Sequence, residues 1–262
     1  MFVNDFPVWR STLLYGEGVG HAFSTRLGGV SRQAHTRTMN TGFYRGDSDE
    51  VVRENIRLLC SYGWCSDSVV GTPQIHSDII RVVTPENVGE GITRDVPYPC
   101  DGFVTDHKGV TLIVRVADCC PVLLKGERAD GSFVVGAVHA GWRGAAAGIA
   151  GKCAKMLFDM GAERVVAAIG PSIGDCCYQV GEDMRDSVAA LQGIEFANRH
   201  IKERDGSLFA NVSGINEEIM RGAGVSEIDV LCECTACKPW LYHSHRATGG
   251  KRGTMAAVIG LN

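Results

Sequence analysis

The chain has 262 residues, of which 45% are hydrophobic and 21% are charged, and its formal net charge is −4. This composition is typical of an ordinary globular protein. The slightly acidic balance and the lack of any run of Lys or Arg argue against a nucleic-acid partner. No apolar run approaches the roughly 20 residues that a membrane-spanning helix needs.

Eleven cysteines are present, and two pairs are vicinal, at 119–120 and at 176–177. Neighbouring cysteines rarely form a comfortable disulfide. The N-terminus, MFVNDFPVWRS, lacks a cationic start followed by an apolar stretch, so no secretory signal is visible. We therefore expect a cytoplasmic protein whose reduced thiols are mostly buried as small hydrophobes, with a few serving as ligands or nucleophiles.

The first third of the chain predicts a strand, a long loop and a helix. Residues 19–25 read as a strand that runs into a glycine turn at 26–29. Residues 31–47 are polar and lack periodicity, which is typical of an ordered loop that carries binding residues. Acidic and capping residues at 47–50 then begin a helix that ends near Gly63.

The middle of the chain is rich in strand-like runs. His76 falls in a predicted strand at 69–77, another strand follows at 79–83, and residues 87–101 form a Gly/Pro-rich excursion. Four further strands are predicted at 102–105, 111–116, 122–124 and 133–138. Their uninterrupted apolar character predicts strands that are covered on both faces.

The last part alternates helices and strands. We expect helices at 145–161, 182–191 and 213–222, and strands at 164–169, 228–231 and 254–259. No repeat or linker divides the chain. The sequence therefore predicts one domain over residues 1–262, of α+β class, with mixed β-sheets flanked by helices.

Three residues at or beside predicted strand ends form the first candidate site: His76, Cys119 and His139. Two imidazoles and one thiolate suit Zn²⁺, and a set of three protein ligands leaves a fourth tetrahedral position open. An open zinc site lowers the pKa of a bound water to about 7. Alternatively, Cys119 is a nucleophile activated by His139, with Asp118 orienting the imidazole.

A second group of ligand-type residues lies near the C-terminus, at Cys232, Cys234, Cys237, His243 and His245. The spacing could form a structural zinc site, but it does not match a pair of C-x2-C motifs. We therefore favour buried thiols at a strand end. On this interpretation His245 and its neighbour Arg246 still line a pocket as polar groups.

Two arginines beside turns, Arg26 and Arg143, are candidates for binding an anion such as phosphate. Either could equally form a structural ion pair. The chain has neither G-x-x-x-x-G-K-[ST] nor a strand-linked G-x-G-x-x-G, which disfavours nucleoside triphosphates and dinucleotides. It also lacks the H-x-E…P-C-x-x-C signature of nucleobase deaminases.

Together, several motifs resemble one family, the multicopper polyphenol oxidase (laccase-like) proteins, also known as purine nucleoside phosphorylases and peptidoglycan editing factors. The motifs occur in family order from about residue 20 onward: FSTRLGGVS (23–31), MNTG (39–42), QIHS (74–77), VADCCPVLL (116–124), VHAGWRG (138–144), IGPSIGDCCYQVG (169–181), CT (234–235) and YHSHR (242–246). The combination of ADC with HAGWRG is highly specific. Ser77, where glycine is common, and His243, in place of an aromatic residue, are small departures that bear on substrate preference.

The resemblance implies a zinc site whose ligands are His76, Cys119 and His139, with copper as the other possible metal. It implies phosphorolysis of adenosine, inosine and methylthioadenosine to free base and ribose 1-phosphate, with adenosine deamination as a side activity. It also implies a layered α/β/β/α fold that is similar to bacterial toxin cysteine hydrolases.

In this interpretation Cys119 and His139 are catalytic, and Asp118 and His245 are the proton donors to the departing base. The expected partners are small molecules only, the nucleoside and phosphate, bound by a monomer or homodimer. The substrate-binding residues would be Arg26, Asn40, Gln74, Arg143, Tyr178 and Arg246.

Three other functions remain open at this point. The first is copper-dependent oxidation of phenols, although eight histidines are few for a multicopper site. The second is a metal-free cysteine hydrolase, and the third is a non-catalytic zinc protein that binds the cell wall or a partner.

Overall fold

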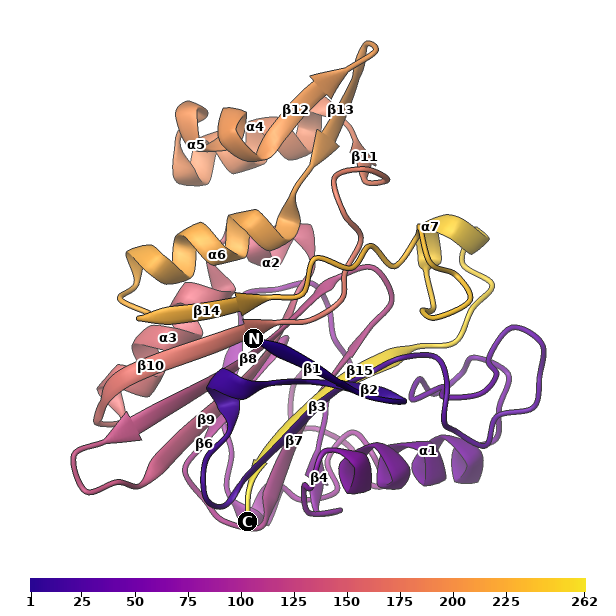
Figure 1. The fold of residues 1–262 in the computed structure, drawn as a ribbon, viewed down its shortest axis with the longest axis vertical. Coiled ribbons are helices and arrows are strands. Elements are labelled where there is room, and N and C mark those ends of the chain that lie inside the picture. The colour runs from indigo at the N-terminus through magenta and orange to yellow at the C-terminus, as the bar shows by residue number, and fades with distance from the viewer.

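Two six-stranded sheets lie at the centre of the computed structural model, which describes residues 1–262 (Figure 1). The first sheet has the order β1 (Phe2–Asp5), β2 (Val8–Ser11), β3 (Val19–Ser24), β15 (Met255–Leu261), β7 (Val110–Val116) and β4 (Val69–Val70). The second has the order β14 (Glu227–Val230), β10 (Ala162–Ile169), β8 (Cys120–Arg128), β9 (Phe133–Ala140), β6 (Gly102–Thr105) and β5 (Ile80–Val82). Both are mixed, because β4–β7, β5–β6 and β10–β14 pair parallel and the other pairs are antiparallel.

The two sheets face each other across an apolar core. Fully buried side chains from both sheets form this core, among them Phe103, Leu112, Leu123, Val135 and Ile259. Burial of such side chains removes apolar surface from water and stabilises each by roughly 1.5–3 kcal/mol. The strands are apolar on both faces because helices cover the outer face of each sheet.

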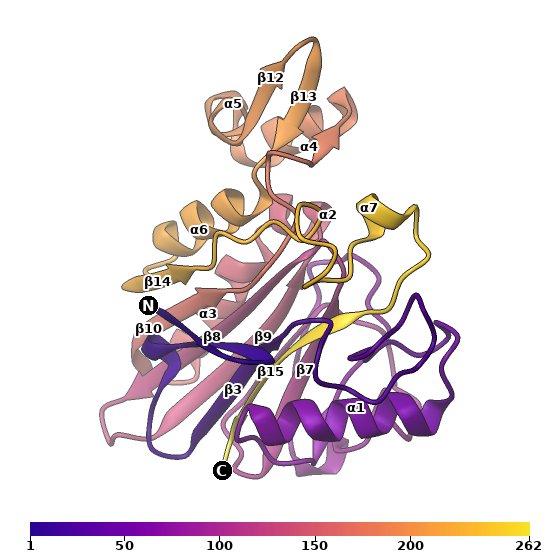
Figure 2. The ribbon, with the colours of Figure 1, turned by 45° about the vertical axis from the view of Figure 1, so that its right-hand side comes forward.

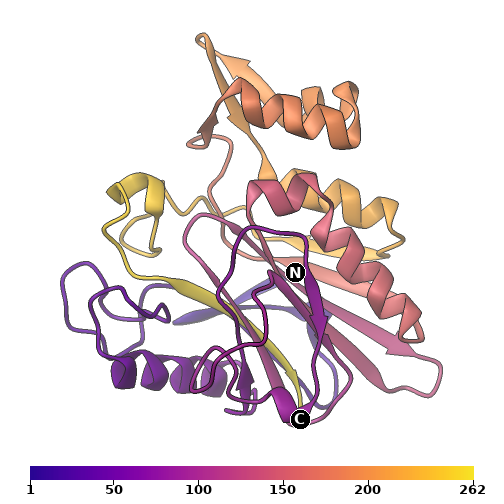
Figure 3. The same ribbon diagram turned by 180° about the vertical axis from the view of Figure 1, so that it is seen from behind.

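Helices form the two outer layers. On the first sheet, α1 (Asp49–Tyr62) packs Val52, Ile56 and Leu59 against strand residues. On the second, α2 (Trp142–Ala146), α3 (Ile149–Asp159) and α6 (Val212–Gly222) lie over the opposite outer face, as the view from behind shows (Figure 3). The predicted α+β class and α/β/β/α layering are therefore confirmed.

Of the projecting part of the chain, the sequence patterns predicted one helix, at 182–191, and missed its strands and its second helix. A three-stranded sheet of β11 (Gln179–Val180), β13 (Ser207–Ala210) and β12 (Ile201–Arg204) stands above the layers with α4 (Glu182–Gln192) and α5 (Ile194–His200) (Figures 1 and 2). Its strands are short and partly polar, so period-two alternation is hard to see. The Asp205-Gly206 turn was the available hairpin signal. One domain over residues 1–262 stays a prediction.

Smaller differences concern element ends. The predicted helix at 145–161 is two helices, because Gly148 adopts φ +79 between α2 and α3. The hairpin of β1 and β2 and the short helices η1 (Thr12–Leu14), η2 (Pro85–Asn87) and α7 (His245–Thr248) were not predicted. None of the helices combines the length and the apolar character that crossing a bilayer requires.

The segment around His76 is the difference that matters most for the site. The predicted strand at 69–77 is wrong beyond Val70, where β4 ends. Residues 71–76 are irregular, and His76 itself has φ +62. Contacts with a buried carboxylate, described below, hold this loop.

Candidate metal centre

Cys119 and His139 meet because β8 and β9 form an antiparallel pair. The register sets Pro121 opposite His139 and Cys120 opposite Ala140. Asp118 has φ +91 and turns the chain between β7 and β8, a conformation that Asp tolerates better than most residues. Cys119 therefore directly precedes β8, next to the strand end that carries His139.

His76 reaches the same place through its contact with Asp101. The Oδ1 atom of this fully buried carboxylate accepts a hydrogen bond from the His76 backbone N–H at 3.0 Å. Its Oδ2 atom accepts from the backbone N–H and the hydroxyl of Ser77, both at 2.7 Å. Since Asp101 directly precedes β6, a rigid strand end shapes the loop that presents His76.

Asp101 also orients His139. The His139 Nδ1 atom lies 2.8 Å from Asp101 Oδ1, and the His139 backbone N–H donates to the Asp101 carbonyl at 2.7 Å. Burial raises the pKa of Asp101, but hydrogen bonds from His139 and Ser77 outweigh it and lower the pKa to about 2. An ionised carboxylate only accepts, so Nδ1 carries the proton and Nε2 is free for a metal. Asp101 was not among the predicted site residues, and its only sequence signal is its position directly before the buried strand β6.

The three ligand-type side chains converge on one point. Their donor atoms all lie within 4.8 Å of one another, and Cys119 Sγ is 3.7 Å from His76 Nε2. The two imidazole rings meet edge to face with centroids 4.9 Å apart. A tetrahedral zinc ion would hold sulfur and nitrogen ligands about 3.6 Å apart. The donor set and its spacing thus fit one metal ion with an open fourth position.

The charges of Cys119 and His139 depend on each other. Burial raises the pKa of the Cys119 thiol, but His139 and His76 outweigh it and lower the pKa to about 6. Burial lowers the pKa of His139, but the Cys119 thiolate and Asp101 raise it to about 9. Without a metal the pair is therefore a thiolate and an imidazolium at neutral pH, and a metal ion would displace the proton from Nε2.

This ion pair predicts the pH dependence of alkylation. In metal-free protein the rate of Cys119 modification by iodoacetamide should rise with pH through about 6, because the thiolate is the nucleophile. Added Zn²⁺ should protect it. Cys120 is an internal control, since burial raises its pKa to about 12. Peptide mass spectrometry across pH 5–9 checks this, and a rate that rises only near pH 9 contradicts it.

A cleft of about 960 Å³ opens beside the centre. His76, Cys119 and His139 form part of its wall, and Phe43 adds an aromatic face. The volume lies at the upper end of the range for small-molecule sites, roughly 300–1,000 Å³. The three ligand-type residues therefore border a cavity that can hold a small molecule.

Two arginines of this cleft have unused donors. Arg45 is exposed, and its guanidinium makes no hydrogen bond or ion pair. Arg252 binds Thr254 Oγ1 at 2.9 Å through Nη1, while its buried Nε has no partner. Burial and nearby Arg45 lower the pKa of Arg252. Neither residue was among the predicted substrate residues, although Arg45 lies in the predicted polar loop at 31–47.

Three predicted substrate residues lie near Cys119 and Asp118. The Arg246 guanidinium lies 5.2 Å from the centroid of the Tyr178 ring and donates to the Gln179 carbonyl at 2.9 Å. Burial and the Cys119 thiolate raise the pKa of Tyr178 to about 12, so its phenol is neutral. Arg143 is exposed and lies over its neighbour Trp142, with no acidic partner.

Three other predicted substrate residues have structural contacts instead. Arg26 donates to the carbonyls of Pro239 at 2.6 Å and Arg37 at 3.2 Å, so its guanidinium is not directed at a phosphate. Asn40 is fully buried and holds the backbone of Gly42 and Thr254. Gln74 borders the cleft, but its amide pairs with the backbone N–H and carbonyl of Arg115, both at 2.7 Å.

The two predicted proton donors lie outside the wall of this cleft. The Asp118 carboxylate accepts hydrogen bonds from the Thr235 hydroxyl at 2.6 Å and from the Arg246 backbone N–H at 2.7 Å. It therefore links its own turn to the segments that carry Thr235 and Arg246. His245 is exposed at the first residue of α7, where its ring makes no hydrogen bond.

The C-terminal cysteines differ from the prediction as well. Cys232 and Cys237 are exposed and Cys234 is half-buried, so the expectation of buried thiols is wrong. Cys234 and Cys237 lie beside Cys176 and Cys177, not beside His243 or His245.

Known proteins with similar sequences and structures fall into one group. Residues 20–262 match the family described as multi-copper polyphenol oxidoreductase laccase. A purine nucleoside phosphorylase of Deinococcus radiodurans is 34% identical, covering 100% of this chain and 95% of that protein. Purine nucleoside phosphorylase YlmD of Geobacillus stearothermophilus is 32% identical, covering 93% and 90%.

A solved structure agrees with these relatives. The hypothetical protein YfiH of Bacillus licheniformis superimposes with a TM-score of 0.88 at 30% identity, over 100% of this chain and 99% of that one. On the matched residues 20–262, the shared fold and these relatives, two of which are named purine nucleoside phosphorylase, this chain belongs to the multi-copper polyphenol oxidoreductase laccase family.

Proposed function

We propose that the protein is a zinc-dependent purine nucleoside phosphorylase. It would convert adenosine, inosine and methylthioadenosine, with phosphate, to free base and ribose 1-phosphate, and would deaminate adenosine as a side activity. The observation that carries the proposal is a group of three ligand-type residues beside a 960 Å³ cleft that Arg45 and Arg252 also line. The names of the relatives support the same reaction class.

The reaction requires charge stabilisation at three places. A phosphate oxygen forms a bond to the anomeric carbon of ribose while the bond from that carbon to the purine breaks, and the electron pair leaves with the base. Arg45 and Arg252 would hold the phosphate dianion. Tyr178 lies near Cys119 but outside the wall of the cleft, and its neutral phenol would donate a hydrogen bond to a base or ribose bound at the metal centre. Zn²⁺ held by His76, Cys119 and His139 would supply a Lewis acid that polarises a substrate oxygen.

Product analysis tests this proposal. The protein is incubated with inosine or adenosine, with and without phosphate, and the products are separated by chromatography. We expect ribose 1-phosphate and free base only when phosphate is present. Free ribose would instead identify a hydrolase, and conversion of adenosine to inosine alone would identify a deaminase. Either result would overturn phosphorolysis as the main reaction.

Two observations favour alternative functions, a copper enzyme and a cysteine hydrolase. A His₂Cys donor set also suits copper, and the metal-free thiolate–imidazolium pair is the arrangement of a cysteine hydrolase. Metal analysis of protein purified without added copper separates zinc from copper. A hydrolase would lose activity with iodoacetamide but not with a chelator, whereas the proposed phosphorylase loses activity with a chelator.

Arg45→Ala tests the phosphate site. Loss of a charge-assisted hydrogen bond should raise the KM for phosphate roughly 10- to 100-fold, with bound zinc unchanged. Arg57→Ala is the matched control, because Arg57 lies on α1, pairs with Glu54 and does not border the cleft. Initial rates at varied phosphate check this. An unchanged KM would mean that phosphate binds away from Arg45, with Arg143 as the next candidate.

A further inference from the structure

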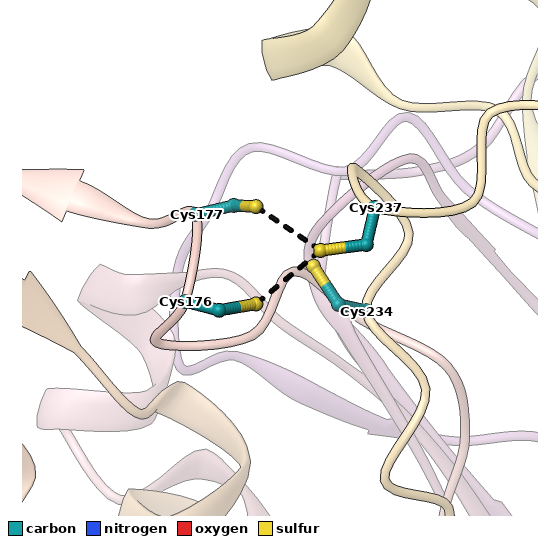
Figure 4. A group of neighbouring side chains, drawn as sticks. All are labelled: Cys176, Cys177, Cys234 and Cys237. Carbon is teal, nitrogen blue, oxygen red and sulfur yellow. Dashed lines mark hydrogen bonds between the residues drawn. The ribbon is translucent and has the colours of Figure 1, made fainter.

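Four cysteine side chains gather at a point outside the centre described above. Cys176 and Cys177 lie in the loop after β10, and Cys234 and Cys237 lie in the loop after β14 (Figure 4). Their sulfur atoms all lie within 4.8 Å of one another. Cys237 Sγ is 3.5 Å from Cys176 Sγ and 3.3 Å from Cys177 Sγ.

The sheet explains why segments so far apart in sequence meet. β10 and β14 pair in parallel, with Ile169 opposite Val230, so both strands end at the same edge. The pairing extends into the loops, because Ser172 and Cys234 form a parallel bridge and the Thr235 backbone N–H donates to the Ser172 carbonyl at 3.0 Å. The backbone therefore sets the two cysteine pairs against each other.

The spacing of the sulfurs matches one shared ion. Four thiolates around tetrahedral zinc, each about 2.3 Å from the metal, lie about 3.8 Å from one another. The observed separations of 3.3 Å, 3.5 Å and at most 4.8 Å bracket that value. An iron–sulfur cluster would need the thiolates farther apart, because its own iron and sulfide atoms would occupy the centre.

The surrounding backbone suits thiolates. The Gly174 N–H donates to Cys234 Sγ at 3.3 Å, a contact that stabilises a negatively charged sulfur. A Cβ atom at Gly174 would lie 3.2 Å from Cys176 Sγ and 3.3 Å from the Cys234 Cβ, so glycine permits this close approach. Arg246 donates to the Cys177 carbonyl at 3.4 Å and brings positive charge to the same loop.

We propose that Cys176, Cys177, Cys234 and Cys237 bind one structural zinc ion as a closed tetrathiolate site. This site is distinct from the His76–Cys119–His139 centre, and its existence does not depend on the reaction proposed above. Four thiolates fill the tetrahedral shell, so no position is left for substrate. The ion would tie the loop after β10 to the loop after β14.

The link between these two loops would also stabilise the turn that carries Cys119. Thr235, next to Cys234, donates to Asp118 Oδ1 at 2.6 Å, and the Ile173 backbone N–H donates to the Asp118 carbonyl at 2.9 Å. Asp118 precedes Cys119. The tetrathiolate site would therefore fix both loops that hold the turn presenting the Cys119 thiolate.

Metal counting in a background without the first centre tests the proposal. Full-length Cys119→Ala protein, purified under reducing conditions, should retain one zinc per chain. Cys119→Ala/Cys237→Ser should retain none. Cys119→Ala/Cys232→Ser is the matched control and should retain one, because Cys232 is exposed in the same loop but lies outside the cluster. Zinc is measured by elemental analysis against protein concentration.

A spectroscopic measurement avoids dependence on the folding of the double variant. Cys119→Ala protein exchanged into Co²⁺ should show tetrahedral ligand-field bands and sulfur-to-cobalt charge-transfer absorption with the intensity of four thiolates. The proposal would be overturned if Cys119→Ala protein contained no zinc or contained iron in place of zinc. It would also be overturned if a thiol titration found these four cysteines oxidised. If the wild-type protein showed no phosphorolysis, that result would contradict the proposed function but not the tetrathiolate site.

Discussion

Replacement of Cys119 by alanine is expected to abolish phosphorolysis and to remove one metal ion per chain relative to the wild type. The thiolate is one of the three proposed ligands, and its Sγ lies 3.7 Å from His76 Nε2. Loss of a ligand should weaken metal binding by more than the roughly 10- to 100-fold that loss of an outer partner costs. Inosine phosphorolysis and elemental analysis of zinc measure the two effects.

Cys120→Ala is the matched control for this variant. Cys120 is the neighbouring thiol, but it is fully buried in the apolar core between the second sheet and its helices. Its replacement should leave both the zinc content and the KM for inosine unchanged. If Cys119→Ala retained full activity together with the zinc content of the wild type, the metal centre and the proposed function would both be lost.

Asp101→Asn is expected to weaken metal binding by roughly 10- to 100-fold and to reduce activity at limiting zinc in proportion. The carboxylate accepts from His139 Nδ1 and from the backbone or hydroxyl of Ile75, His76 and Ser77. An amide has one acceptor oxygen in place of two and adds N–H groups that face other donors. Each donor left without a partner costs roughly 1–3 kcal/mol. We therefore expect the substitution to disturb both the orientation of the His139 ring and the conformation of the loop that carries His76.

A zinc titration with a competing chelator measures this effect, and restoration of activity by excess zinc separates weak binding from misfolding. Asp78→Asn is the control, because Asp78 belongs to the same segment but pairs with Lys152 at the surface. Its zinc affinity should equal that of the wild type. Asp101→Asn protein that bound zinc as tightly as the wild type would remove Asp101 from the metal centre.

The residue patterns predicted mixed sheets flanked by helices, and the resemblance to a known family implied the four layers that the structure shows. Long apolar runs such as 111–116 and 133–138 can be buried on both faces only between a second sheet and a layer of helices. The short partly polar strands β12 and β13 escaped prediction, because four residues carry too little periodicity. The irregular loop at 71–76 escaped because the carboxylate that shapes it lies 25 residues away along the chain.

The sequence by itself selected His76, Cys119 and His139 as the candidate metal ligands, because few side chains bind transition metals and these stand in distinctive motifs. Only the tertiary structure decided which neighbours serve them. In the structure the Asp101 carboxylate contacts His139, and both Arg45 and Arg252 line the cleft. Arg26 and Asn40 instead form hydrogen bonds to the backbone of loops. The structure also places Cys176 and Cys177 beside Cys234 and Cys237. The physical reason is that periodicity encodes which face of a strand is buried, whereas contacts between loops depend on strand pairing over long sequence separations.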